Sequence, residues 1–151
     1  MDRELKELYQ QVILDHNRNP KNYGKLEPCS HKAEGYNPLC GDQVTVYLQV
    51  EDGVIKDIHF EGSGCAISRA SASVMTTELK GKTVQEAEEL FKKFQELVTS
   101  DVHKEVDFSE YGKLAVFAGV REFPTRVKCA ILAWHTGMAA LKEENRVVST
   151  E

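Results

Sequence analysis

The chain has 151 residues, of which 41% are hydrophobic and 28% charged, with a formal net charge of −5 at pH 7. This balance predicts a single folded domain over residues 1–151 and argues against nucleic acid as a partner, because phosphate backbones attract basic surfaces. Without a membrane-length apolar run or the apolar stretch of a secretion signal, we expect a cytoplasmic protein with no membrane partner.

The first element predicted is a helix. Apolar residues recur at helical spacing over residues 3–16, and Asn19-Pro20 ends the pattern. Residues 25–39 have no hydrophobic period, so we expect a loop there. A further strand just before Cys40 is too weakly patterned to predict.

Two strands follow. Polar and apolar residues alternate over residues 43–50, which is the clearest strand pattern in the chain. Residues 51–53 have the composition of a hairpin turn. A second strand over residues 54–61 should place Ile58 and Phe60 on its inner face.

Two helices come next. A helix is predicted over residues 65–80, with Gly81 as its natural stop. Its residues 66–73 are mostly alanine and serine, which indicates that another element packs closely on it. Thr83 and Glu86 have the spacing of a capping box that opens the following helix.

The last third is helical as well. Residues 99–111 are polar and irregular, residues 114–120 are predicted to be helical, and Pro124 suits the first turn of a final helix. The tail after Glu144 is expected to be loose. Strands early and helices late favour an α+β fold: a small antiparallel β-sheet packed on one face by helices, with an N-terminal helix and a long C-terminal helix.

Three cysteines and one aspartate fall at the ends of these elements, where loops gather at one edge of a layered domain. Reduced cysteines indicate metal binding or catalysis, although a buried cysteine can also be a small hydrophobic residue. Three thiolates and one carboxylate supply the four ligands of tetrahedral Zn²⁺, or one edge of an iron–sulfur cluster. The four residues are Cys40, Asp42, Cys65 and Cys129. The fourth cysteine, Cys29, is interpreted as an incidental loop thiol.

The charge and the ligand types of these four residues indicate what kind of metal site they could form. Such a zinc site carries excess negative charge, which Arg126 and Lys128 beside Cys129 could offset. A carboxylate is a hard ligand among soft ones, so it is easily displaced, which suggests a site that opens. No cysteine–histidine pair for thiol catalysis and no phosphate-binding glycine loop is recognisable.

Four motifs occur in order along nearly the whole chain. They are Tyr9-x-x-Val12-Ile13-x-Asp15-His16-x-x-Asn19-Pro20, Asn37-Pro38-x-Cys40-Gly41-Asp42, Phe60-Glu61-Gly62-x-Gly64-Cys65-x-Ile67-Ser68-x-Ala70-Ser71-Ala72-Ser73 and Arg126-Val127-Lys128-Cys129-Ala130. With these motifs the sequence resembles the U-type iron–sulfur cluster assembly proteins, which comprise SufU, IscU and the N-terminal domain of NifU.

Three features resemble the SufU branch of that family. The separation of Cys65 and Cys129 is longer than in IscU proteins. Lys128 stands where IscU has a histidine. Residues 122–126 keep only the proline of the Leu-Pro-Pro-Val-Lys motif by which IscU binds its chaperone.

The resemblance implies a SufE/NifU-like fold and a zinc site made by Cys40, Asp42, Cys65 and Cys129. It also implies a SufS-like cysteine desulfurase partner, a pyridoxal-phosphate enzyme whose persulfide sulfur passes to Cys40. The chain would then be a sulfurtransferase-like acceptor that acts with this partner and supplies a downstream cluster scaffold or apo iron–sulfur proteins. The alternative is a scaffold that assembles a [2Fe–2S] cluster on the three cysteines, and a third possibility is a purely structural zinc domain.

Overall fold

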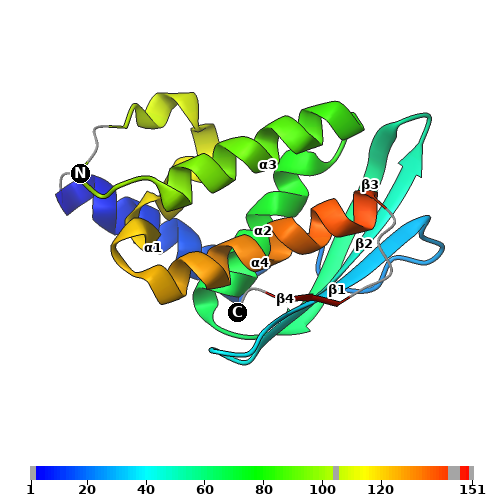
Figure 1. Ribbon diagram of the computed structural model, residues 1–151, viewed down its shortest axis with the longest axis horizontal. Helices are drawn as coiled ribbons and strands as arrows, with labels where there is room; N and C mark the ends of the chain where they lie inside the picture. The colour runs from blue at the N-terminus through cyan, green and yellow to red at the C-terminus, as the bar shows by residue number, and fades with distance from the viewer. Residues whose placement is uncertain (1–2, 104–105, 143–146, 150–151) are drawn as a thin grey trace.

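The computed structural model describes residues 3–103, 106–142 and 147–149. They form an α+β fold in which a sheet lies against a layer of helices (Figure 1). In chain order the elements are α1 (Arg3–Arg18), β1 (His31–Asn37), β2 (Asp42–Glu51), β3 (Val54–Ser63), α2 (Ala66–Leu79), α3 (Val84–Thr99), the 3₁₀ helices η1 (Phe108–Glu110) and η2 (Gly112–Glu122), α4 (Pro124–Leu141) and β4 (Val147–Ser149).

The sheet has the strand order β3–β2–β1–β4, and β2 is antiparallel to both β1 and β3. The alternation predicted for β2 is confirmed, since Val44, Val46 and Leu48 are all buried on the helix side. β2 and β3 are joined at Asp52 and Gly53, whose φ angles of 52° and 73° are both positive. Two positive φ angles are typical of the type I′ hairpin turn, so the predicted hairpin is confirmed.

The loop expected over residues 25–39 is wrong in its second half, which is strand β1. The residues of β1 that face the helices are Ala33, Gly35 and Asn37, all buried. Small and polar residues produce no hydrophobic alternation, which explains why the pattern was missed. A Cβ atom added at Gly35 would lie 2.0 Å from Thr136 Oγ1, so the missing side chain lets α4 cross the strand closely.

The loose tail expected after Glu144 is also wrong for residues 147–149. They form β4, which pairs in parallel with β1 between Glu34 and Tyr36. A three-residue strand is too short to show an alternating pattern of polar and apolar residues. Its position depends instead on a partner strand far away in the sequence. The other residues of the tail lie outside the described part of the chain.

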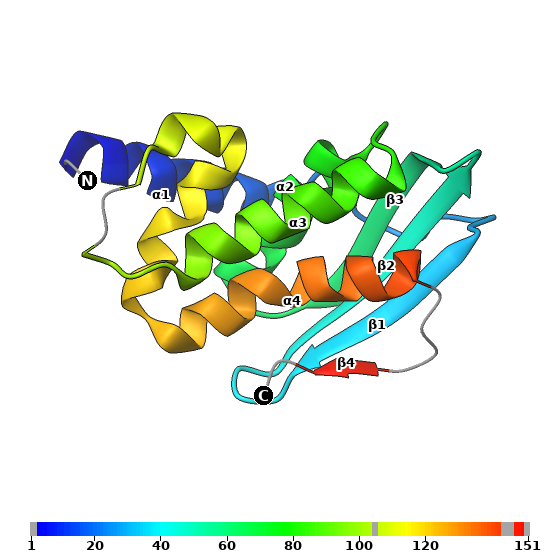
Figure 2. The ribbon, with the colours of Figure 1, turned by 45° about the horizontal axis from the view of Figure 1, so that its top comes forward.

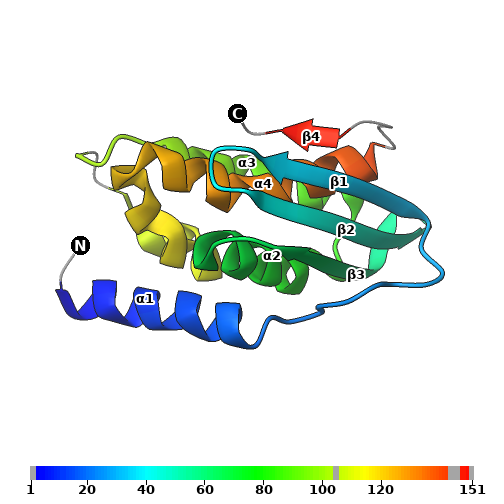
Figure 3. The same cartoon turned by 90° about the horizontal axis from the view of Figure 1, so that it is seen from below.

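Helices α2 and α4 pack against one face of the sheet, with α1 on α2 and α3 on α4 (Figures 2 and 3). The close packing predicted for the small residues of α2 is confirmed. Ala70 and Ala72 are buried, and the buried Ser71 hydroxyl donates a hydrogen bond to the Ala130 carbonyl of α4. This close approach brings the first turns of α2 and α4 near each other.

The helices that complete the core begin as predicted. The capping box of α3 is present, with the Glu86 N–H 3.1 Å from Thr83 Oγ1 and the Thr83 N–H 3.0 Å from Glu86 Oε1. The helical segment predicted over residues 114–120 is part of η2. In the core, Trp134 of α4 stacks on Phe94 of α3 at 4.7 Å between ring centroids. Within the described ranges, none of the helices has both the length and the apolar character to cross a membrane.

Candidate metal centre

The turn between β1 and β2 presents two candidate ligands in opposite environments. Cys40 is exposed, whereas Asp42, at the first position of β2, is fully buried. Between them Gly41 has a φ of 70°, a conformation that residues with a Cβ rarely adopt. The chain therefore reverses direction between a solvent-facing thiol and an inward carboxylate.

Cys65 is the N-cap of α2, and it is hydrogen-bonded to Asp42. Its thiol accepts a hydrogen bond from the Ser68 N–H at 3.4 Å, and its own N–H donates to Asp42 Oδ1 at 2.8 Å. A Cβ atom added at Gly64, which has a φ of 155°, would lie 2.3 Å from that same Asp42 oxygen. The glycine before Cys65 therefore makes room for the buried carboxylate.

Cys129 lies in the second turn of α4, and its side chain is buried. Its Sγ atom lies 3.4 Å from Cys40 Sγ and 3.4 Å from the Thr125 carbonyl. Burial raises the pKa of the Cys129 thiol well above its usual range, and hydrogen bonds with Asp42 and Cys40 and the nearby Cys65 thiol raise it further. A bound cation would be needed to hold this thiol as a thiolate at neutral pH.

The four predicted ligands converge. The ligand atoms of Cys40, Asp42 and Cys129 all lie within 4.8 Å of one another, and Cys65 Sγ lies beside this set, 4.0 Å from Asp42 Oδ2. Two thiolates on one tetrahedral zinc ion are roughly 3.8 Å apart, so the spacing of 3.4 Å between Cys40 and Cys129 needs little adjustment.

The burial of Asp42 supports a cation at this place. Its side chain is fully buried, yet it forms no ion pair with any residue in the described ranges. A buried carboxylate without a positive partner is strongly unfavourable. The donor set therefore fits a thiophilic divalent ion such as Zn²⁺, and the thiolates also fit iron.

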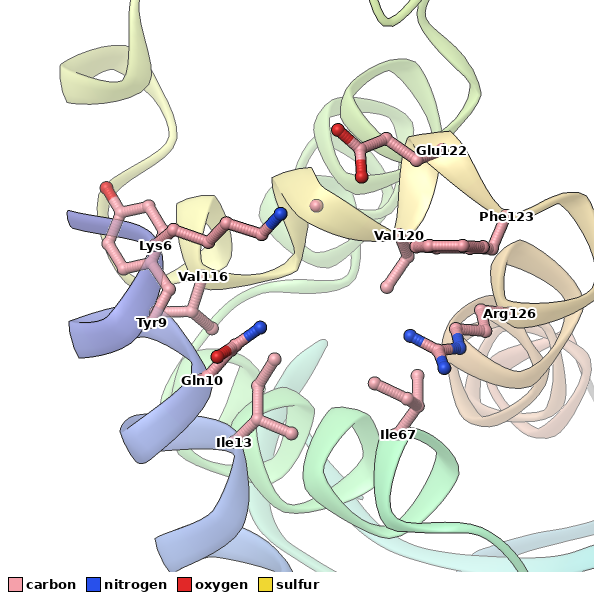
Figure 4. Close-up of a pocket in the computed structure, with 11 residues that line it drawn as sticks. Lys6, Tyr9, Gln10, Ile13, Ile67, Val116, Val120, Glu122, Phe123 and Arg126 are labelled. Atoms are coloured by element: carbon pink, nitrogen blue, oxygen red, sulfur yellow. The ribbon is translucent and has the colours of Figure 1, made fainter. Parts of the chain in front are cut away.

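Three of the ligands open into a surface groove that the sequence did not predict. Cys40, Cys65 and Cys129 all line it, together with residues of α1 and of the first turns of α2 and α4. The groove meets a smaller, mainly apolar pocket between α1 and η2, in which Ile13, Ile67 and Arg126 point inward (Figure 4). The other residues that line the groove are Gln10, Leu14, Ala66 and Thr125.

The two predicted cations differ in position. Arg126 lines the groove together with the cysteines, and its guanidinium lies 4.4 Å from the centre of the Phe123 ring. Lys128 is not among the lining residues. The difference follows from helical phase: Arg126 lies three residues before Cys129, about 60° from it around α4, whereas Lys128 lies about 100° away.

Asn37 is a central residue of the site to which the sequence pattern assigned no role. Its fully buried side chain lies against both Asp42 and Cys129. The only sequence feature that could have identified Asn37 is a polar residue at an inward-facing position of a strand. That feature becomes visible only when β1 is known to be a strand. The chain's other cysteine, Cys29, lies near Tyr47 and belongs to no metal-like set in the described residues.

Comparison with known proteins identifies the family of this chain. The family model "NifU-like N terminal domain" matches residues 8–130. The chain is 41% identical to the "Iron-sulfur cluster assembly scaffold protein IscU" of Thermotoga maritima, over 94% of this chain and 98% of that protein. It is also 41% identical to the "Zinc-dependent sulfurtransferase SufU" of Bacillus subtilis, over 86% of each. A crystal structure of a candidate SUF-system scaffold from Fervidobacterium islandicum AW-1 superposes with a TM-score of 0.80 at 40% identity, covering 89% of this chain and 97% of that one.

Proposed function

The chain belongs to the family of NifU-like N-terminal domains, and from that premise we propose that it accepts persulfide sulfur from a cysteine desulfurase for iron–sulfur cluster assembly. The proposal treats residues 1–151 as one domain with a zinc site made by Cys40, Asp42, Cys65 and Cys129. It places the protein in the cytoplasm, where thiols stay reduced.

The observation that carries this proposal is the unequal exposure of two adjacent sulfur atoms. Cys40 is exposed at the mouth of the groove, whereas Cys129, 3.4 Å away, is buried. A thiol that receives sulfur must reach a partner's persulfide, and Cys40 is the exposed ligand, whereas Cys65 is half-buried and Asp42 and Cys129 are buried. When bound, Zn²⁺ would stabilise the ligand thiols in the deprotonated form, the form in which Cys40 is a nucleophile.

The transfer is a thiol–persulfide exchange that needs no added oxidant. The Cys40 thiolate attacks the outer sulfur of the partner's persulfide, and a new S–S bond forms on Cys40. The partner's own S–S bond breaks, and its electron pair stays on the partner cysteine as a thiolate. In the groove wall, Arg126 supplies a positive charge that favours the anionic sulfur species.

A second candidate function is the [2Fe–2S] scaffold, with the cluster as cargo on Cys40, Cys65 and Cys129. The thiolate-rich set suits iron, and the IscU relative carries that name at the same identity as the SufU relative. Lys128 weighs against it, because an ammonium group cannot take the place of an imidazole ligand while one thiolate exchanges. In both cases the products would pass to a later scaffold or to apo iron–sulfur proteins.

The test combines zinc-loaded protein with cysteine and a cysteine desulfurase from the same genome. Mass spectrometry should find one added sulfur on the Cys40 peptide, and desulfurase turnover should rise severalfold with the zinc form but not with the metal-free form. The Cys29→Ser variant is the control and should behave as the unaltered protein.

Two outcomes would replace this proposal. Sulfur found only on Cys65, Cys129 or Cys29 would refute Cys40 as the acceptor. If zinc gives no stimulation, while a reconstituted cluster is stable and passes efficiently to an apo-ferredoxin, the scaffold function should be adopted instead. The metal content of protein purified anaerobically from its own host bears on the same choice.

A further inference from the structure

Asn37, the last residue of β1, has a side chain that is wholly enclosed between the ligands of the proposed metal site. Its exposed fraction is 0%. Its Nδ2 atom lies 3.4 Å from Asp42 Oδ2 and 3.6 Å from Cys129 Sγ. One amide group therefore faces the carboxylate and the thiol that are themselves buried.

The oxygen end of the same amide faces the turn that carries Cys40. Asn37 Oδ1 accepts a hydrogen bond from the Leu39 N–H at 3.3 Å. This bond determines which end of the amide is oxygen, since only oxygen can accept, and so directs the NH₂ group to Asp42 and Cys129. The Asn37 side chain thus contacts two ligands directly, Asp42 and Cys129, and the turn that carries a third, Cys40.

The chemistry of an amide matches these neighbours. Asp42 Oδ1 is already held by the Cys65 N–H at 2.8 Å, and the Asn37 amide supplies a donor for the other oxygen. Donors beside metal-binding carboxylates and thiolates fix their orientation, and loss of such a neighbour typically weakens metal binding about 10–100-fold. An apolar side chain here would leave Asp42 Oδ2 without this donor, and a carboxylate would add repulsion.

We propose that Asn37 is a positioning residue that makes Asp42 and Cys129 the retained pair of ligands, so that Cys40 is the ligand that leaves. This inference rests on the proposed function, because it assumes that the four residues hold a metal. It adds a reason for the order of release. It also replaces the expectation, drawn from ligand hardness, that the carboxylate is displaced: the Cys65 N–H and the Asn37 amide both donate to Asp42 and hold it in place. The NH₂ group of Asn37 donates to the two buried ligands, Asp42 and Cys129. Toward the exposed ligand Cys40 the amide contacts only the backbone, through the Leu39 N–H.

The test compares two substitutions with a matched control. Asn37→Leu keeps the same branching and number of side-chain heavy atoms, although leucine is larger, and it removes the amide. Asn37→Ser can still accept from the Leu39 N–H, but it is too short to reach the ligands as the amide does. Asn22→Ala is the control, because its amide also donates a side-chain hydrogen bond, to Thr76 Oγ1 at 3.0 Å, away from the metal site.

Three measurements follow on each protein: unfolding by urea without metal, zinc dissociation into a chromophoric chelator, and the absorption spectrum of the Co²⁺ form. Both Asn37 variants should bind zinc about 10–100-fold more weakly and show an altered cobalt spectrum. Asn22→Ala should lose stability and leave the spectrum and the affinity unchanged.

The order of thiol release gives the decisive readout. Brief alkylation of zinc-loaded protein should label Cys40 well before Cys129, and that preference should shrink several-fold in Asn37→Ser. If the Asn37 variants match Asn22→Ala in affinity, spectrum and labelling order, Asn37 is only structural and the inference fails. If Asn37→Leu does not fold, the results for Asn37→Ser alone decide whether Asn37 positions the ligands. If the unaltered protein binds neither Zn²⁺ nor Co²⁺, the proposed function itself fails.

Discussion

Cys40 and Cys129 place their sulfur atoms 3.4 Å apart, yet the regions that carry them are built in opposite ways. Cys129 is buried in α4, against the carbonyl of Thr125 and the amide of Asn37. Cys40 is exposed in the turn between β1 and β2, beside the flexible Gly41. The contrast indicates a metal site with a fixed half in the core and a movable half at the surface.

Such a division suits sulfur transfer better than a uniformly buried site would. A structural zinc site closes all four positions, whereas a transfer site has to free one ligand without losing the metal. Here the exposed ligand is held by a short turn, and the buried ligands are held by the core. Substitutions in each half can test this division, and the ligands themselves should be the most sensitive positions.

The largest effect should come from removing a ligand in each half. Cys129→Ser should lose more zinc affinity than the 10–100-fold typical of changes beside a metal site, because a core ligand is gone. Cys40→Ser should retain zinc more tightly than Cys129→Ser but accept no sulfur. Chelator competition and mass spectrometry measure the two properties. Equal zinc loss in both variants would show that the two halves do not differ.

The next effect concerns the glycines of the two halves. Gly64→Ala places a Cβ against Asp42 in the core, so strain and overpacking together should lower the free energy of unfolding by about 3 kcal/mol. Gly41→Ala meets open space and should cost only about 1–2 kcal/mol of backbone strain. Urea unfolding of the metal-free variants gives both values. A larger loss for Gly41→Ala would contradict the rigid-core assignment.

A smaller effect is expected for the two cations. Arg126→Gln should slow sulfur acceptance several-fold, since this guanidinium lines the groove, and the slowing should shrink as salt screens the charge. Lys128→Gln should slow it less, because its side chain lies elsewhere around α4. Rapid-quench labelling of Cys40 measures the rate. A greater effect of Lys128 would favour the role first inferred from its place beside Cys129.

The smallest effect involves His16, which tethers α1, a wall of the groove. Its Nδ1 lies 2.7 Å from Ser73 Oγ. Burial lowers the pKa of His16 below 6.5, and Lys21 and Lys113 lower it further, while Asp15 opposes them. The unfolded chain therefore binds more protons below about pH 6.5, so stability should fall as pH drops from about 7 to 5.

In His16→Gln, this part of the acid destabilisation should be absent from urea unfolding curves of the metal-free protein. His103→Gln, at an exposed position, is the control and should leave the curves unchanged. An identical pH dependence in His16→Gln and the unaltered protein would show that His16 does not contribute to the acid sensitivity.

Much of the fold could be predicted from local patterns. The alternation of β2, the Asp52-Gly53 turn and the capping box of α3 are encoded by residues close in sequence, and all are confirmed. β1 and β4 could not be predicted in this way. β1 turns small residues toward α4, and β4 is too short for a pattern, so both depend on partners distant in the chain.

Local motifs identified the residues that could form the site, because they fix the order of Cys40, Asp42, Cys65 and Cys129 along the chain. They could not determine which thiol is exposed, since exposure depends on how β2, α2 and α4 pack around each sulfur atom. Only the tertiary structure brought Asn37 between two ligands. That residue lies far from Cys129 in sequence, and its contact exists because β1 and α4 pack against each other in the folded core.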